Sequence, residues 1–231
     1  MIIILDFDDV LFNTLRFKKE LAIIFQRYKL DFQKIYNKIK SNKNIFSLEK
    51  CLNLAQKENK NIDIKKLNKS IDRLFENLNQ FLYSDTLDFL NSVQDYNLIL
   101  LSWGEEKFQK RKIYGLGKEF TSFFNKIITG PLEKNKVLDK ILKSCKDKSI
   151  VFIDDKISEL EKIRTRFKNV ILIQLKRSAN RLSTEKKYIK VTNLSEVEKI
   201  IKKNVPGTTT PNSPISIGPK NTGKQKINNI N

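Results

Sequence analysis

The sequence predicts an α/β protein in which helices cover both faces of a parallel sheet and a small all-α unit is inserted early in the chain. Three observations support this. Short aliphatic runs, typical of strands buried on both faces, recur through the chain and begin with Ile2 to Leu5. From residue 85 onward, segments with helical spacing separate these runs, which favours right-handed crossovers between parallel strands. Between residues 13 and 84 only helical spacing is present.

The expected strands and helices alternate along the second part of the chain. The strands are expected at Ile2–Leu5, Leu98–Leu101, Lys126–Thr129, Ile150–Ile153 and Val170–Ile173, with an edge strand at Tyr188–Val191. The helices are expected at Thr86–Asp95, Glu105–Tyr114, around Val137 to Leu142, at Glu159–Phe167 and at Ser195–Lys202. In the first of these helices, Leu87, Leu90 and Val93 are expected to face inward.

The segment from Asn13 to Ser84 is expected to form a bundle of about four helices, whose apolar stripes are packing surfaces. Asp63 is a candidate N-cap for the last of them. The predicted domains are therefore an α/β core (1–12 and 85–204) and a helical cap (13–84). Residues 205–231 are rich in Pro, Thr, Ser and Asn, a composition that predicts a disordered tail.

The composition excludes several classes of function. The chain of 231 residues has no histidine, which excludes His-ligated zinc and Ser-His-Asp catalysis. Cys51 and Cys145 are isolated, which fits a reduced, cytoplasmic environment, and no apolar run reaches the length of a membrane span. The net charge of +19 is compatible with nucleic-acid binding. Lysine is spread through the whole chain, however, so a nucleic-acid partner is an alternative that the sequence does not favour.

Acidic and hydroxyl side chains follow the expected strands where they end. Asp6 and Asp8 follow the first strand, Ser102 the second, and Asp154 and Asp155 the fourth. Because ligands of open α/β sheets bind at the carboxyl ends of the strands, these groups are expected to meet at one edge. Carboxylates placed this close repel one another and lose solvation, so they indicate a bound cation or a reaction.

This arrangement resembles the four motifs of the haloacid dehalogenase (HAD) superfamily, in order, over about residues 1–204. The matching residues are Asp6-x-Asp8-x-Val10, Ser102, the stretch Lys134-Asn135-Lys136 and the pair Asp154-Asp155. The stretch from Gly104 to Lys112, continuing to Phe123–Ile128, is similar to HAD phosphatases that carry a helical cap after the first motif. The resemblance implies a Rossmann-like, HAD-type core. Asp9 and Val10 depart from it, standing where many members have Gly and Thr.

The resemblance also implies roles for these residues. Asp6 would attack phosphorus and form an aspartyl-phosphate, while Asp8 would protonate the leaving alcohol and then activate water. An acid at position 8 argues for a phosphatase over the dehalogenases of the superfamily, which lack it. Mg²⁺ would be held by the Asp6 carboxylate, the Asp8 backbone carbonyl and Asp155, with Asp154 as an additional acid and Glu159 as a supporting one.

Phosphate binding is implied for Ser102 and for a lysine of the third motif. Lys134 lies four residues before Leu138, which is more similar to the spacing in the family than the position of Lys136 is, and both lysines remain candidates. Ser102 would offer its hydroxyl beside a helix N-terminus, although it would also serve as a simple helix cap. Trp103 is included with the phosphate-binding residues, although packing is the simpler explanation for it.

The sequence thus predicts a cytoplasmic, Mg²⁺-dependent phosphomonoester hydrolase acting on a small phosphorylated metabolite, such as a nucleotide or a sugar phosphate. One alternative is a sugar phosphomutase of the same superfamily, which would return the phosphoryl group to another hydroxyl. Another is a polynucleotide end phosphatase or nucleic-acid binder that uses the basic surface. The sequence does not indicate the oligomeric state.

Overall fold

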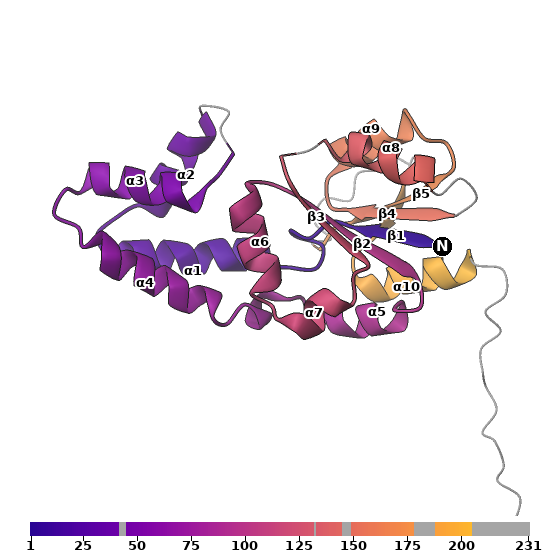
Figure 1. Ribbon diagram of the computed structural model, residues 1–231, viewed down its shortest axis with the longest axis horizontal. Coiled ribbons are helices and arrows are strands. Elements are labelled where there is room, and N and C mark those ends of the chain that lie inside the picture. The colour runs from indigo at the N-terminus through magenta and orange to yellow at the C-terminus, as the bar shows by residue number, and fades with distance from the viewer. Residues whose placement is uncertain (42–44, 132, 145–148, 178–187, 205–231) are drawn as a thin grey trace, which may run out of the picture.

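The computed structural model describes residues 1–41, 45–131, 133–144, 149–177 and 188–204. The predicted tail and Cys145 lie outside these residues. The described chain contains a six-stranded parallel sheet in the order β3-β2-β1-β4-β5-β6, with a helical insert directly after β1 (Figure 1). The predicted α/β class with a parallel sheet and an inserted helical unit is confirmed.

The strands coincide closely with the aliphatic runs. They are β1 (Ile2–Leu5), β2 (Asn97–Trp103), β3 (Lys126–Gly130), β4 (Ile150–Asp154), β5 (Val170–Leu175) and β6 (Ile189–Val191). β1 lies between β2 and β4, and its four residues are fully buried. A strand covered on both faces needs apolar side chains on both, which explains its unbroken aliphatic run.

Helices cover the two faces of the sheet. Ile2 and Ile4 of β1 pack in a core with α8 (Lys134–Ser144) and α9 (Ile157–Arg164). Ile3 and Leu5 face the other core, which α5 (Thr86–Ser92), α6 (Glu106–Tyr114), α7 (Lys118–Ser122) and α10 (Leu194–Lys203) help to form. Figure 1 shows α8 and α9 on one side of the sheet and α5, α7 and α10 on the other. Successive residues of β1 alternate between these cores because strand side chains have a period of two.

The insert consists of α1 (Thr14–Arg27), α2 (Phe32–Ser41), α3 (Leu48–Glu58) and α4 (Ile64–Phe75), followed by a 3₁₀ turn at Asn79–Phe81. Figure 1 places it at one end of the sheet. As predicted, the Asp63 side chain caps α4 by accepting a hydrogen bond from the Lys66 N–H. Phe17 of α1 packs against Phe12, Phe75 and Phe81, which joins the insert to the chain leaving β1.

One expected packing position is wrong. Helical spacing predicts that Leu87 faces inward, but it is 47% exposed, whereas Phe89, Leu90 and Val93 are buried. The inward face of α5 also takes Thr86, whose hydroxyl donates to the Leu11 carbonyl at 3.0 Å, and this contact turns Leu87 outward.

In the described part of the chain, no helix has both the length and the apolar character that crossing a membrane requires.

Candidate active site

The register of the sheet brings the acids that follow β1 and β4 together. Leu5 pairs with Ile153, so Asp6 leaves β1 level with Asp154, the last residue of β4. The Asp6 N–H donates to the Ile153 carbonyl at 3.0 Å, which fixes its backbone. Because both faces of the central strands are packed, a slip of one residue would move every side chain of β1 to the other face and disrupt both cores. The fold itself therefore sets the distance between these acids.

Asp6, Lys134, Asp154 and Asp155 form what we call the sheet-side cluster. Lys134, the first residue of α8, places Nζ at 2.8 Å from Asp6 Oδ1 and at 2.6 Å from Asp154 Oδ2. Burial alone would lower the pKa of Lys134, but the charges of Asp6 and Asp154 raise it above its usual range. Lys134 is thus a buried, charged lysine shared between two carboxylates.

One lysine does not neutralise three acids. Burial raises the pKa of Asp6 to about 7; Lys134 lowers it and Asp154 raises it further. Burial likewise raises the pKa of Asp155 to about 6, with Lys156 opposing the shift and Asp154 adding to it. Lys134 is the only lysine within ion-pairing distance of these carboxylates in the described part of the chain. The cluster is therefore short of positive charge.

The donor set of this cluster fits a small divalent cation. Asp6, Asp154 and Asp155 each present an oxygen, and these oxygens lie within 4.8 Å of one another. Asp155 Oδ1 is buried and has no hydrogen-bond partner among the described residues. Mg²⁺ prefers carboxylate oxygens and keeps several waters, so it suits a site with few protein ligands. Both Asp154 oxygens already accept hydrogen bonds, from Lys134 Nζ and from the Lys156 N–H.

A second group, which we call the helix-side cluster, consists of Asp8, Thr14, Gln109 and Lys112. Asp8 Oδ1 accepts from Lys112 Nζ at 2.5 Å and from the Thr14 hydroxyl at 2.7 Å, and Oδ2 accepts from Gln109 Nε2 at 2.8 Å. Burial alone would raise the pKa of Asp8, but Lys112 and the hydrogen bonds from Thr14 and Gln109 lower it to about 2. Asp8 is therefore an ionised carboxylate held by three donors.

Lys112 reaches Asp8 through an aromatic environment. It lies on α6, its side chain is 2% exposed, and Nζ is 5.3 to 5.4 Å from the ring centroids of Phe7, Phe12 and Phe108. A buried ammonium is costly unless it is paired, so Asp8 and the faces of these rings hold it in place. Lys112 thereby links α6 to the segment that follows β1.

Asp9 stands where many members of the HAD superfamily have Gly, and the local backbone explains why an aspartate is tolerated there. Asp9 has a φ of 60°, in the left-handed region that glycine adopts without strain. Aspartate tolerates this region better than most residues because its short side chain can bond locally. Here Asp9 Oδ1 accepts from the Thr14 N–H at 3.2 Å, which ties the turn to the start of α1.

The end of β2 supplies a hydroxyl and a tight backbone approach. Ser102 is buried, and its Oγ has no hydrogen-bond partner among the described residues, so it is available to a ligand. Gly104 has a φ of 157°, and a Cβ there would lie 2.5 Å from Gln109 Nε2. That nitrogen also donates to the Trp103 carbonyl at 2.9 Å. Gly104 therefore allows Gln109 to reach Asp8.

The structure does not bring all the predicted site residues together. Of the two lysines left open by the sequence, Lys134 lies in the sheet-side cluster, whereas Lys136 is largely exposed and contacts Glu133 at 3.1 Å. The two side chains point apart because two positions along a helix correspond to a rotation of about 200° around the axis. Glu159 pairs with Lys162 on α9 and is not among the acids grouped around Asp6. Trp103 is 40% exposed and lines a cavity.

This cavity has a volume of about 330 Å³ and lies between the insert and the carboxyl edge of the sheet. Asp8, Asp9, Gly104 and Gln109 contribute to its core side, and α1 and α2 contribute to its other wall. Its size is at the lower end of the range for small-molecule sites. The helix-side cluster therefore opens onto a space that can hold a small ligand.

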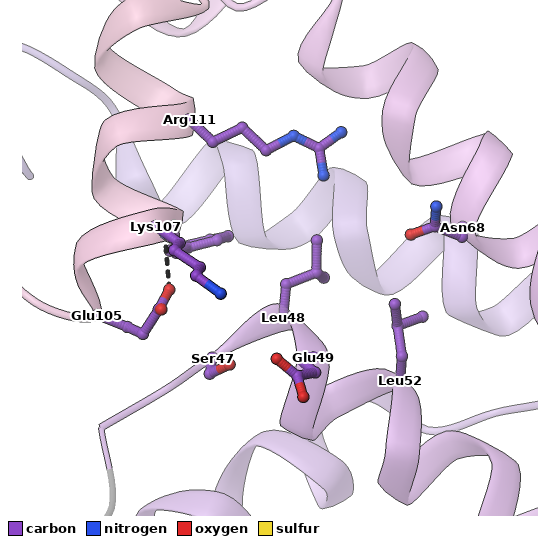
Figure 2. A pocket seen from close by; sticks show the side chains of 9 residues that line it. Ser47, Leu48, Glu49, Leu52, Asn68, Glu105, Lys107 and Arg111 are labelled. Carbon is purple, nitrogen blue, oxygen red and sulfur yellow. Dashed lines mark hydrogen bonds between the residues drawn. The ribbon is translucent and has the colours of Figure 1, made fainter.

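A second cavity of about 270 Å³ lies between α6 and helices α3 and α4. Figure 2 shows Lys107 and Arg111 extending from α6 toward Leu48, Glu49 and Asn68. Arg111 Nη2 contacts Asp72 Oδ1 at 2.5 Å. This cavity shares Glu105 and Phe108 with the first one, but Asp8 lines only the first.

Three residues of the helix-side cluster received no role from the sequence. Thr14, Gln109 and Lys112 are separated from Asp8 by 6, 101 and 104 positions. A local signal existed for two of them, since Gln109 and Lys112 share one face of a helix that has few apolar residues. Such a pair usually faces solvent, so only the fold shows that it faces Asp8.

Comparisons with known proteins give matches in structure and not in sequence. No protein-family model matches the chain, and no curated protein is detectably similar to it. A haloacid dehalogenase-like hydrolase from Burkholderia xenovorans superposes with a TM-score of 0.68 at 15% identity, covering 86% of this chain and 97% of that one. The chain has the HAD-like hydrolase fold.

Two other solved structures with the HAD-like fold cover a similar share of this chain. The HAD-hydrolase YfnB from Bacillus subtilis, bound to magnesium, has a TM-score of 0.60 at 12% identity and covers 88% of this chain and 98% of its own. The L-2-haloacid dehalogenase from Xanthobacter autotrophicus has a TM-score of 0.59 at 10% identity, and the match covers 88% of this chain and 99% of that one. The predicted HAD-type fold with a helical cap region is confirmed. At such identities the likeness concerns the fold, and the activity has to be argued from the site.

Proposed function

We propose that this protein is a Mg²⁺-dependent phosphomonoester hydrolase that works through an aspartyl-phosphate on Asp6. The observation that carries the proposal is the sheet-side cluster, in which Lys134 pairs with two of the three acids and Asp155 Oδ1 has no hydrogen-bond partner among the described residues. The magnesium bound to YfnB, a protein of the same fold, supports the choice of metal. The likeness to a haloacid dehalogenase does not decide between C–halogen and P–O substrates.

Asp6, Asp155 and the backbone carbonyl of Asp8 would hold the Mg²⁺, which would supply positive charge to the phosphoryl oxygens. Asp6 attacks phosphorus in its ionised form, and Lys134, 2.8 Å from Oδ1, favours that form. The Ser102 hydroxyl, for which the described residues supply no hydrogen-bond partner, donates to a phosphoryl oxygen. Burial of the cluster strengthens these electrostatic interactions, because little water is present to screen them.

Asp8 and Lys112 donate a proton to the leaving group and later accept one from the attacking water. In the first half-reaction the P–O bond to the alcohol breaks, and the leaving oxygen takes a proton from the Asp8–Lys112 pair. Lys112 Nζ, 2.5 Å from Asp8 Oδ1, holds that proton beforehand. In the second half-reaction water attacks the phosphoryl group, and its proton returns to the same pair. The ionised state of Asp8 suits this second step, which requires a base.

A panel of phosphomonoesters with purified protein and Mg²⁺ tests the proposal. We expect release of inorganic phosphate, its loss in excess chelator, and better recovery with Mg²⁺ than with Ca²⁺, whose looser coordination misplaces the reacting groups. Release of free phosphate also separates a hydrolase from a sugar phosphomutase, which yields an isomerised sugar phosphate. Chloride release from 2-chloropropionate, without phosphatase activity, would favour a dehalogenase.

Asp155→Asn and Glu159→Gln form a matched pair for the metal. Both remove one acid near the start of α9, but only Asp155 belongs to the sheet-side cluster, whereas Glu159 pairs with Lys162. We expect the first variant to require much more Mg²⁺ for turnover and the second to behave like wild type. Full activity in excess chelator, or equal Mg²⁺ requirements for both variants, would contradict the proposal.

A further inference from the structure

Two lysines of the insert line the cavity next to Asp8. Lys18 of α1 and Lys40 of α2 are half-buried, and neither forms a salt bridge with any acid in the described part of the chain. Other lysines of α2 behave differently, because Lys34 and Lys38 both contact Glu58. The other two lysines in the cavity lining lie on the core side: Lys112 is paired with Asp8, and Lys156 interacts electrostatically with Asp6 and Asp155. Lys18 and Lys40 are therefore the cations that the insert contributes to the cavity.

Neutral aromatic side chains hold these two ammonium groups. Lys18 Nζ donates to the Tyr36 hydroxyl at 3.1 Å and is 4.6 Å from the centroid of that ring. Lys40 Nζ is 5.4 Å from the ring centroid of Trp103, at the end of β2. An aromatic ring steadies a cation without cancelling its charge. Each ammonium therefore keeps its ability to bind an anion.

The same cavity has an apolar wall. Phe46 and Phe108 line it together with Trp103, which is one of the few large apolar residues left exposed on the described chain. An exposed indole beside a cavity provides a flat surface against which a small organic group can pack. Asp8 lies in the lining as well, so the cavity leads directly to the proposed site of proton transfer.

From this arrangement we propose that the substrate carries a second anionic group on its organic part. Lys18 and Lys40 would bind that group, a carboxylate or a further phosphate, while the organic part packs against Trp103. The inference rests on the proposed phosphatase function, because the first phosphate has to reach Asp6 for the second anion to lie in this cavity. Lys18 and Lys40 are then residues that determine specificity.

Three aryl phosphates provide matched probes. 4-Carboxyphenyl phosphate and 4-carbamoylphenyl phosphate have nearly the same shape and differ in one negative charge, and 1,4-phenylene bisphosphate carries a phosphate at that position. We expect wild type to favour both anionic probes over the amide by about 10- to 100-fold in kcat/KM, the size expected for hydrogen bonds to a charged group. Similar preferences for the two anions indicate general anion binding, and a preference for one identifies the group.

Lys18→Gln and Lys40→Gln should each reduce the ratio of carboxylate to amide turnover by about tenfold or more. Comparing the ratio in each variant with the ratio in wild type cancels the intrinsic difference in reactivity between the probes. Lys19→Gln is the control, since it removes the same charge from the neighbouring, exposed position of α1, outside the cavity lining. We expect it to keep the wild-type ratio. An equal fall in the control would show an effect of overall charge and overturn the inference.

Calorimetry with Ca²⁺ in place of Mg²⁺ measures the binding of the same probes without relying on turnover. The carboxylate probe should bind about tenfold more tightly than the amide, and both lysine variants should lose that difference. If no probe is hydrolysed but this preference persists, the phosphatase proposal fails and the anion site stands. Hydrolysis of all probes with equal affinities and equal kcat/KM overturns the anion site alone.

Discussion

The two clusters of the site treat similar carboxylates in opposite ways. Asp6 shares Lys134 with Asp154, and burial raises its pKa to about 7. Asp8, two residues later, has Lys112 to itself and two further donors, and its pKa falls to about 2. Burial penalises both charges, so the number of donors per carboxylate decides the outcome. The sheet-side cluster thus has fewer positive than negative charges and suits a cation, whereas in the helix-side cluster Lys112 balances the charge of Asp8 and fixes that carboxylate in position.

Catalysis provides the test with the largest expected effect. Asp6→Asn removes the nucleophile and a metal ligand, so turnover should fall by about 10⁴-fold or more. Asp8→Asn should cost about 10²- to 10⁴-fold on alkyl phosphates and less on aryl phosphates, whose leaving groups need no proton. Because water must still be activated, a rapid burst followed by a stalled phospho-enzyme is expected. Equal losses on both substrates without a trapped intermediate would show that Asp8 has another role.

Stability separates the two buried lysines. Lys134→Met leaves two buried carboxylates without their cation and should cost about 3–5 kcal/mol in urea unfolding, much of which Mg²⁺ should restore. Lys112→Met leaves Asp8 its bonds to Thr14 and Gln109 and should cost about 1–3 kcal/mol, without recovery in Mg²⁺.

Lys143→Met is the control for these two variants, because this exposed lysine contacts Asp139 on the surface of α8. Its effect should stay within about 0.5 kcal/mol. If Mg²⁺ restored the stability of both Lys134→Met and Lys112→Met, or of neither, the proposed difference between the two clusters would be wrong.

Metal binding should also stabilise the unchanged protein. At a Mg²⁺ concentration of 100 times the Kd, a ligand that binds only the folded state adds about 2.7 kcal/mol. Thermal unfolding should show this gain in wild type and in Asp8→Asn, whose backbone carbonyl is intact, and a much smaller gain in Asp155→Asn. The same gain in Asp155→Asn would place the metal elsewhere.

The prediction with the smallest expected effect on stability concerns Cys51, a buried free thiol whose pKa is raised by burial. Burial raises the pKa of its thiol to about 12, whereas the thiol of the unfolded chain ionises near pH 9. Above pH 9 the unfolded state has lost a proton that the folded state retains, so this group's contribution to stability falls as pH rises. The slope is up to about 1.4 kcal/mol per pH unit. Cys51→Ala should therefore flatten the decline in the free energy of unfolding between pH 9 and 10.5, as measured by urea unfolding. An unchanged slope would show that the pKa of Cys51 is not raised in the folded state.

The sequence by itself determined most of the fold. The aliphatic runs predicted every strand of the described sheet to within a few residues, because a strand buried on both faces admits little besides aliphatic side chains. It also placed Asp6, Ser102 and Asp154 at strand ends, and a parallel sheet necessarily brings such ends to one edge. Leu87 shows the limit, since helical spacing alone did not reveal which neighbours α5 would meet.

Only the tertiary structure decided which groups contact each carboxylate. Lys134 and Lys136 were both candidates by spacing, and the direction of the first turn of α8 brought Lys134 alone to Asp6. Lys112 could not be assigned from sequence, because it meets Asp8 across 104 positions through the packing of α6 on the segment after β1. The pattern of residue types in the sequence indicates which chemical groups are present. Contacts between distant segments, which determine burial and charge pairing, form only when the chain folds.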